Sequence, residues 1–215
     1  MILQKNLKRR IVLRRVTASA LVFLGSTIFP KIIHAGLLAT PTQAEGPFYP
    51  IDKPIDQDGD LTLVANQAKR AQGDVCIITG QISRGGLPVP GVRVEIWQAN
   101  KWGRYQDKRD NSNLPLDHNF QGFGVSVSDK NGHYIFKTIR PAGYSFGGIY
   151  RTPHIHFKVK EVGADNFVTQ MYFAGDSGNN RDVFLNNIAR KESVVVKFRP
   201  LANGHQIGVF DIVLG

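Results

Sequence analysis

Two histidines placed two positions apart are the first residues in this sequence that indicate chemistry. His154 and His156 fall in the run Arg151-Thr-Pro-His-Ile-His-Phe157, directly after Pro153. Side chains at positions i and i+2 of a strand project from the same face, so the two imidazoles would stand side by side. Neutral imidazole is a common metal ligand in proteins. The pair therefore predicts a metal site, and a solvated strand face is the alternative that the spacing leaves open.

Further ligands for such a metal would have to supply nitrogen or oxygen. The sequence has one cysteine, Cys76, so a disulfide framework and a Cys-based zinc cluster are both excluded. Tyr105 and Tyr144 stand in glycine-flanked, turn-like settings. Because the reference pKa of tyrosine is near 10, only a strongly Lewis-acidic ion would hold a tyrosinate at neutral pH. Ferric iron prefers hard anionic oxygen and is favoured by this set, whereas ordinary surface or core tyrosines are the simpler alternative.

The formal net charge of +10 belongs to the N-terminus. Residues 1–35 hold seven of the 27 Lys and Arg residues and no Asp or Glu, which leaves 20 basic against 17 acidic residues, a net of +3, in the rest of the chain. A nucleic-acid-binding body is therefore not expected. The N-terminus has the layout of an export signal: a cationic stretch, then an apolar stretch over residues 16–30, then a small residue, Ala35, at a plausible cleavage point. The pair Arg9-Arg10 resembles a twin-arginine signal. We expect residues 1–35 to direct a bacterial protein to the periplasm or outside the cell, by the twin-arginine or the general secretory route, with an uncleaved membrane anchor as the alternative.

The rest of the chain divides into an arm and an all-β domain. Residues 36–72 are rich in Pro, Gly and Asp without a sustained apolar period, which predicts an extended arm that packs on the body. Short apolar runs between turn residues over 73–215 predict a two-sheet antiparallel β-sandwich with little helix. The one expected helix covers residues 179–189. The expected strands cover residues 75–82, 92–98, 124–128, 134–139, 155–160, 168–173, 194–198 and 207–213.

Seven stretches together carry a resemblance to a known family over residues 40–214. They occupy residues 40–50, 94–100, 103–105, 131–144, 151–157, 169–176 and 210–214. Each stretch alone is weak, but all of them in this order are specific. The sequence resembles the intradiol ring-cleavage dioxygenases, most closely the protocatechuate 3,4-dioxygenase beta-chain type.

The resemblance implies a mononuclear non-haem Fe(III) centre and a set of residues that hold it. The matching positions are Tyr105 and His154 as equatorial ligands, and Tyr144 and His156 as axial ligands. Tyr144 would also act as a base toward the substrate. Arg151 would be the second catalytic residue, because its fixed charge would stabilise the anionic substrate.

The implied reaction opens a catechol-type ring between its two hydroxyls with O2 and yields a cis,cis-muconate-type product, in the catabolism of aromatic compounds. Gln170 in the body and Gly46 and Pro47 in the arm match substrate-binding positions. The partners would be a small aromatic diol, O2, and either further copies of this chain or a related chain in a hetero-oligomer. Ser145-Phe146 departs from the Pro-Trp typical of protocatechuate enzymes, so the reaction class carries over better than the substrate.

Two functions from other classes compete with this interpretation. An exported, non-catalytic β-sandwich module that binds carbohydrate or protein would have the same fold, because a fold does not fix a function. A hydrolase with zinc on His154 and His156 would need a third histidine or carboxylate ligand, and none lies at a recognisable offset. Four tyrosine and histidine matches in order favour the dioxygenase over both.

Overall fold

Strands make up nearly all of the regular structure in the computed structural model, which describes residues 38–215. The expected export signal at residues 1–35 lies outside that range. None of the helices in the described range has the length and apolarity needed to cross a bilayer. The strands are β1 Val75–Arg84, β2 Leu87–Pro88, β3 Arg93–Trp97, β4 Phe123–Val127, β5 His133–Ile139, β6 Tyr144–Phe146, β7 Ile149–Arg151, β8 His154–Lys160, β9 Phe167–Phe173, β10 Val195–Val196, β11 Arg199–Pro200, β12 Gln206–Val209 and β13 Ile212–Leu214. The helical elements are the 3-10 turns η1 Asn179–Arg181 and η2 Lys191–Ser193 and the short helix α1 Val183–Asn186.

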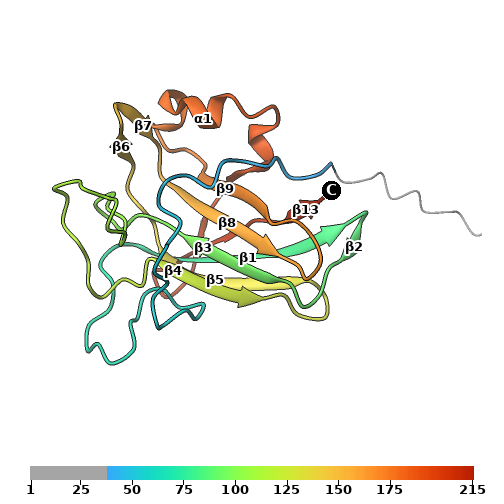
Figure 1. The fold of residues 1–215 in the computed structure, drawn as a ribbon, viewed down its shortest axis with the longest axis horizontal. Helices are drawn as coiled ribbons and strands as arrows, with labels where there is room; N and C mark the ends of the chain where they lie inside the picture. The colour runs from blue at the N-terminus through green and yellow to red at the C-terminus, as the bar shows by residue number, and fades with distance from the viewer. Residues whose placement is uncertain (1–37) are drawn as a thin grey trace, which may run out of the picture. The chain divides into compact units, whose positions relative to one another are not determined.

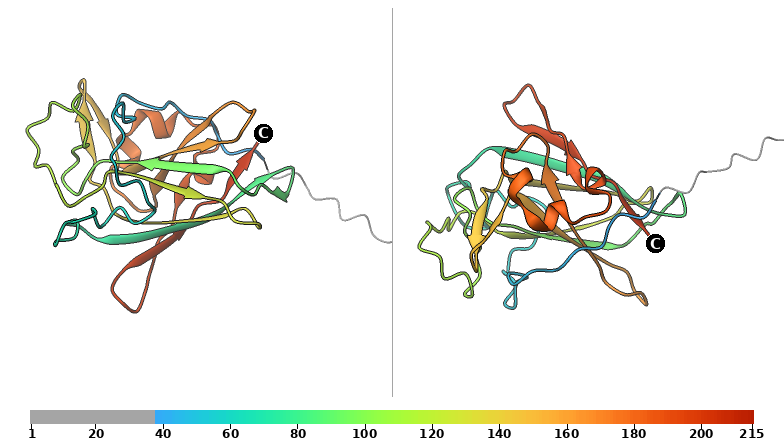
Figure 2. Two further views of the ribbon diagram at one scale, coloured as in Figure 1. Left: turned by 60° about the horizontal axis from the view of Figure 1, so that its bottom comes forward. Right: turned by 90° about the horizontal axis from the view of Figure 1, so that it is seen from above.

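Two sheets pack face to face around one main core (Figure 1). One sheet has the order β11-β12-β1-β13, with β5 and β2 also paired to β1, and the other has the order β10-β9-β8-β3-β4. Ile78 and Phe136 from the first sheet meet Ile96 and Phe157 from the second, and none of the four is exposed to solvent. The predicted all-β sandwich is confirmed. Figure 2 adds two further views, in which the β11–β12 hairpin projects beyond the neighbouring strands.

The strand pairing is mixed, which corrects the expectation of purely antiparallel sheets. β12 and β13 both run parallel to β1, and β10 runs parallel to β9. Residues 207–213, predicted as one strand, divide into β12 and β13 around Phe210. The carbonyl of Phe210 accepts a hydrogen bond from the Tyr134 hydroxyl, and its ring packs against Phe157 at 5.0 Å between centroids. The Phe210 ring is thus buried in the core at the point where the two strands divide.

The expected helix at residues 179–189 is also corrected, because Asp182 interrupts it. Asp182 has an extended backbone, with φ −80° and ψ 106°, and separates η1 from α1. Its carboxylate accepts hydrogen bonds from the backbone N–H groups of Phe184 and Leu185, the capping arrangement that starts a helix. The cap satisfies two backbone donors but breaks the helical path, so only four residues form α1.

The arm segment, residues 38–72, crosses the outer face of the second sheet and then follows its edge (Figure 1). The backbone N–H of Gln43 donates to the carbonyl of Val168 on β9 at 2.8 Å. The Gln43 amide donates to the carbonyl of Gln170 at 2.9 Å. The arm is thus attached to the body of its own chain.

A buried carboxylate on β3 anchors the same arm. Glu95 accepts hydrogen bonds from the Tyr49 hydroxyl at 2.7 Å and from Lys53 at 2.9 Å, both in the arm. Arg93 at 2.8 Å and Lys160 at 3.1 Å complete the cluster from the sheet. Burial raises the pKa of Glu95, but the four hydrogen bonds outweigh it and bring the pKa down to about 2. The charged form of Glu95 therefore ties the arm to the sheet.

Candidate active site

The four predicted metal ligands come from three elements that lie at one end of the sandwich (Figure 1). His154 and His156 occupy the first and third positions of β8, so strand alternation places both on the outer face. Tyr144 is the first residue of β6, and Tyr105 lies in the long loop between β3 and β4. Long-range strand pairing thus brings together residues separated by up to 51 positions in the sequence.

The four side chains form one cluster of rings with their polar atoms facing inward. The Nε2 atoms of His154 and His156 are 3.2 Å apart, and the hydroxyl oxygens of Tyr105 and Tyr144 are 3.5 Å apart. The ring centroids of Tyr144 and His154 are separated by 5.6 Å, and those of Tyr105 and His156 by 6.3 Å. Tyr105 and both histidines are almost fully buried. Two nitrogen and two oxygen donors therefore converge in a space that the protein shields from water.

Both imidazoles are held in the neutral form. The Nδ1–H of His154 donates to the carbonyl of Thr152 at 2.6 Å, which leaves the lone pair on Nε2 facing the cluster. Burial, with the charge of Arg151 adding to it, lowers the pKa of His154. Burial lowers the pKa of His156, and the nearby His154 ring lowers it further because two protonated imidazoles would repel each other. Trp97 stacks on the His156 ring at 4.7 Å and 11°, which fixes its orientation.

Neither tyrosine would be ionised at neutral pH without a nearby cation. Burial, and then the neighbouring Tyr144, raises the pKa of Tyr105 well above its ordinary value. Burial also raises the pKa of Tyr144. An adjacent cation of high charge would reverse this balance, because it stabilises phenolate more than burial destabilises it.

The donor set fits a metal only if the tyrosines take part. No group of three His, Cys, Asp or Glu side chains within residues 38–215 is placed to hold a metal ion. The zinc hydrolase alternative requires such a third ligand and is therefore not supported by this part of the chain. Two neutral imidazoles with two phenol oxygens match an ion that accepts hard anionic oxygen together with nitrogen, as Fe(III) does. The Nδ1 atom of His156 is buried without a hydrogen-bond partner among the described residues, so Trp97 stacking is what orients this ring.

Arg151, the last residue of β7, is held beside the cluster by a network of polar side chains. Its Nε donates to Asp182 at 3.0 Å, and its Nη2 donates to the side-chain oxygen of Gln170 at 2.6 Å and to the Tyr172 hydroxyl at 3.2 Å. Nη1 takes part in none of these bonds. The Phe184 ring lies 4.6 Å from the guanidinium carbon. The network fixes Arg151 opposite Tyr144 and uses only two of its three nitrogens.

Sequence reasoning missed Asp182 and Tyr172 as members of the site. Asp182 is fully buried and binds the Thr152 N–H at 2.9 Å as well as Arg151. Tyr172 donates from its hydroxyl to Gln43 of the arm at 3.0 Å. A lone Asp before a short apolar run was the only local signal for Asp182, and that signal indicates a helix cap rather than a site.

The arm residues predicted to contact substrate also reach this end of the sheet. Gly46 has φ +75°, and a Cβ built on it would lie 3.2 Å from Cε1 and 3.8 Å from Nε2 of His156. The side-chain amide of Gln170 donates to the carbonyl of Ala44 at 2.9 Å, which fixes this part of the arm. Gly46, Pro47 and Gln170 line one cavity of about 110 Å³ together with Tyr144 and Arg151.

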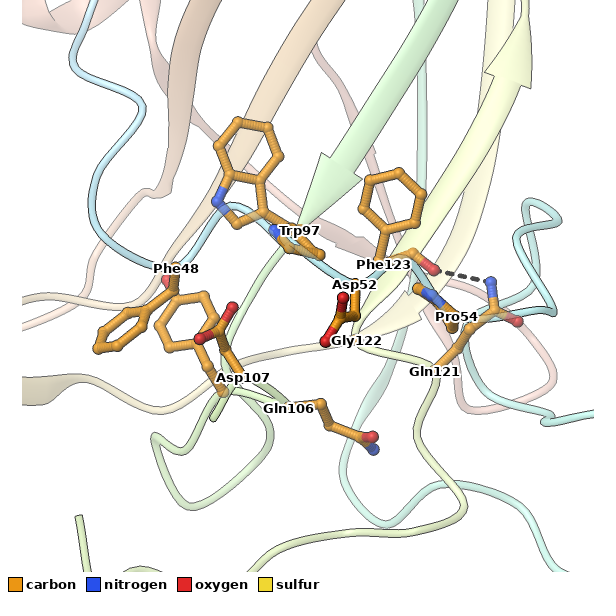
Figure 3. Close-up of a pocket in the computed structure, with 11 residues that line it drawn as sticks. Phe48, Asp52, Pro54, Trp97, Gln106, Asp107, Gln121, Gly122 and Phe123 are labelled. Atoms are coloured by element: carbon orange, nitrogen blue, oxygen red, sulfur yellow. Dashed lines mark hydrogen bonds between the residues drawn. The ribbon is translucent and has the colours of Figure 1, made fainter. Parts of the chain in front are cut away.

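A second cavity of about 230 Å³ lies against Tyr105 and Trp97 but lacks the other groups of the cluster (Figure 3). The rings of Phe48 and Phe123 and the carboxylates of Asp52 and Asp107 border it. Both carboxylates are paired with cations, Asp52 with Lys108 at 3.0 Å and Asp107 with Arg109 at 2.7 Å. Of the two cavities, only the smaller one touches both Tyr144 and Arg151.

Known proteins are similar to most of this chain. A family profile described as Dioxygenase matches residues 44–215. The chain is 38% identical over 167 residues to the protocatechuate 3,4-dioxygenase beta chain of Burkholderia cepacia, covering 73% of this chain and 71% of that one. This chain belongs to the intradiol ring-cleavage dioxygenase family. It is also 28% identical to the catechol 1,2-dioxygenase of Candida albicans, over 74% of this chain and 54% of that enzyme, so it spans about half the length of that relative.

Solved structures of intradiol dioxygenases share the fold. The dioxygenase domain of a dioxygenase–carbohydrate-binding fusion from Streptomyces sp. SirexAA-E aligns with a TM-score of 0.62 and 26% identity, over 82% of this chain and 97% of that one. The catechol 1,2-dioxygenase of Acinetobacter sp. ADP1 aligns with a TM-score of 0.63 and 27% identity, over 82% of this chain and 62% of that one. The family is therefore supported by sequence and by fold.

Proposed function

We propose that this chain is a non-haem Fe(III) dioxygenase that cleaves a catechol-type ring between its two hydroxyls and yields a cis,cis-muconate-type product. The observation that carries the proposal is the convergence of two phenol oxygens and two imidazole nitrogens beside Arg151. Tyr105, Tyr144, His154 and His156 would hold the metal. Membership of the dioxygenase family supports the same reaction class.

The metal would activate the bound catechol toward O2, and the residues around it would accept a proton and stabilise negative charge. A ferric ion, when bound, would keep the phenols ionised and draw electron density from a bound catecholate so that its ring can react with O2. The Tyr144 oxygen would accept one of the two protons that the catechol loses on binding. The Arg151 guanidinium would stabilise the negative charge on the substrate, and its pairing with Asp182 and Gln170 fixes it in place without reorganisation.

The arm would complete the pocket and limit the access of water. Gly46 and Pro47 line the cavity, and Gln43 and Ala44 attach the arm to β9 through hydrogen bonds with the backbone carbonyl and the side-chain amide of Gln170. A low-water site strengthens the interaction between Arg151 and an anionic ring. We further propose that the N-terminal segment exports the chain to the periplasm or beyond. Assembly with copies of itself, or with a related chain, is also proposed, and the beta-chain name of the Burkholderia relative supports the second form.

The test is oxygen uptake by the iron-loaded chain with catechol, protocatechuate and hydroxyquinol, with identification of the product. We expect uptake of one O2 per ring and a product opened between the hydroxyls. Metal analysis of protein purified without added metal should give iron near one per chain, and the ferric protein should absorb visible light. A product opened beside the hydroxyls would refute the reaction, and a chain that binds no iron would favour the non-catalytic binding module.

A further inference from the structure

The wall of the substrate cavity that faces away from the diol-binding groups is apolar. Tyr144, Arg151 and Gln170 are polar side chains that line the 110 Å³ cavity, and Phe184 packs on the Arg151 guanidinium. Phe146 and Ile149 line it from the tip of the β6–β7 hairpin. If the two hydroxyls of a catechol lie at the Tyr144 end, as the proposed function requires, the far edge of the ring faces these apolar side chains.

One short hairpin carries both ends of this cavity. β6 and β7 pair so that Tyr144 lies opposite Arg151 at the base and Phe146 lies opposite Ile149 at the tip. Gly147 and Gly148 form the turn, with φ +58° and +79°. The tip lies beside α1, which supplies Phe184 (Figure 1). A substituent on the far edge of the ring would therefore meet the hairpin tip.

The side chains at the tip leave apolar surface for such a substituent to cover. Phe146, Ile149 and Phe184 are each exposed by between 42% and 45% of their surface. Phe146 is oriented by an edge contact with Phe48, at 5.1 Å between centroids. A methyl group that removes this surface from water gains affinity, and one methylene in an apolar pocket changes kcat/KM by about 10-fold or more.

A charged substituent would find no free cation there. Arg151 is the one charged side chain that lines the cavity within residues 38–215, and it lies at the base of the hairpin, opposite Tyr144, where the diol would bind. A carboxylate placed against the apolar wall would lose its hydration without gaining an ion pair, which is strongly unfavourable.

From these observations we infer that the site prefers catechols whose ring substituent is uncharged and apolar, such as an alkyl group or a halogen, and discriminates against a ring carboxylate. The inference rests on the proposed function, because it uses the orientation that the diol takes there. It separates this chain from the Burkholderia relative, which is named for the carboxylate-bearing protocatechuate.

The experiment compares catechol, 4-methylcatechol and protocatechuate on the iron-loaded full chain. Both kcat/KM and anaerobic binding measured by calorimetry are recorded. We expect 4-methylcatechol to exceed catechol by about 10-fold or more and protocatechuate to fall at least about 100-fold below catechol. Protocatechuate equal to or better than 4-methylcatechol would overturn the inference while leaving the proposed function intact. A chain that neither binds nor cleaves any of the three diols would instead refute the proposed function.

A pair of variants tests the assignment of the wall itself. Ile149→Lys places a cation at the hairpin tip and should raise the ratio of protocatechuate to 4-methylcatechol, in binding and in kcat/KM, by at least about 10-fold. Val209→Lys adds the same charge at an exposed position on β12 and should leave the ratio unchanged. Equal ratios in the two variants would show that the substituent does not reach the tip, and would overturn the assignment.

Discussion

Replacing Gly46 by alanine tests whether the arm sets the geometry of the proposed metal site. Alanine at φ +75° costs about 1–2 kcal/mol of stability because its Cβ crowds the backbone. The same Cβ would lie 3.2 Å from Cε1 of His156, closer than ordinary contact, so the ring or the arm has to shift by a few tenths of an ångström. Trp97 stacks on that ring and resists its movement. A shift of this size is expected to lower kcat/KM by about 10-fold, since a 1 Å misplacement can cost about 100-fold.

Gly91 offers a matched control for the backbone strain. Its φ is +73°, and a Cβ built there would meet nothing within 4 Å. Urea unfolding of the metal-free proteins should show both Gly46→Ala and Gly91→Ala losing about 1–2 kcal/mol. Iron content after dialysis and kcat/KM should fall in Gly46→Ala alone. If the two variants retain iron and turn over equally, contact between the arm and His156 does not set the geometry of the site, and this prediction is wrong.

Three more changes have defined outcomes. Asp182→Asn keeps a side chain able to cap α1 but removes the charge paired with Arg151. We expect kcat to fall about 10- to 100-fold with iron content unchanged. A wild-type kcat would contradict this role of Asp182. Tyr105→Phe removes one phenol oxygen, so ferric iron should bind at least about 10-fold more weakly and visible absorption should diminish; an unchanged spectrum would remove Tyr105 from the proposed ligands. The folded pKa of Glu95 is about 2, below the reference value of 4.5, so its stabilisation of about 3 kcal/mol is present above pH 4.5 and is lost as the pH falls toward 2. Urea unfolding at pH 3 and pH 6 should show a smaller loss of stability in Glu95→Gln than in the wild type, and an identical loss would contradict the linkage.

Local pattern predicted the long strands of the sandwich and the histidine pair because both depend on short-range rules, whereas the short strands β6 and β7 were not predicted. The alternation that predicts β8 also places His154 and His156 on one face, so the histidine pair follows from the same two-residue period. The glycine-flanked settings of Tyr105 and Tyr144 marked them as loop-borne or strand-end residues. Tyr105 and Tyr144 lie close to the histidines because of tertiary packing. The family resemblance, and not the spacing of the residues, predicted that proximity.

The errors arose where a distant partner decides the local structure. β12 and β13 run parallel to β1 because the C-terminal segment returns to a strand more than 120 residues earlier, and no local pattern specifies that direction. Asp182 breaks the predicted helix because its carboxylate serves both a helix cap and Arg151, which is 31 positions away. Burial of a charge pair between distant elements leaves no periodic signal in the sequence.

The β6–β7 hairpin would allow the proposed chemistry to be retained while the substrate changes. Its register places the proposed ligand Tyr144 and the charged Arg151 opposite each other at the base, where Asp182 and Gln170 hold Arg151 from outside the hairpin. The tip is made of two side chains and two glycines, and in this hairpin sheet the tip residues pair only with each other. If the proposed function holds, substitutions at the tip would alter what meets the far edge of the ring without moving the groups proposed to meet the diol. The departure from Pro-Trp at residues 145–146 falls in this separable part of the site.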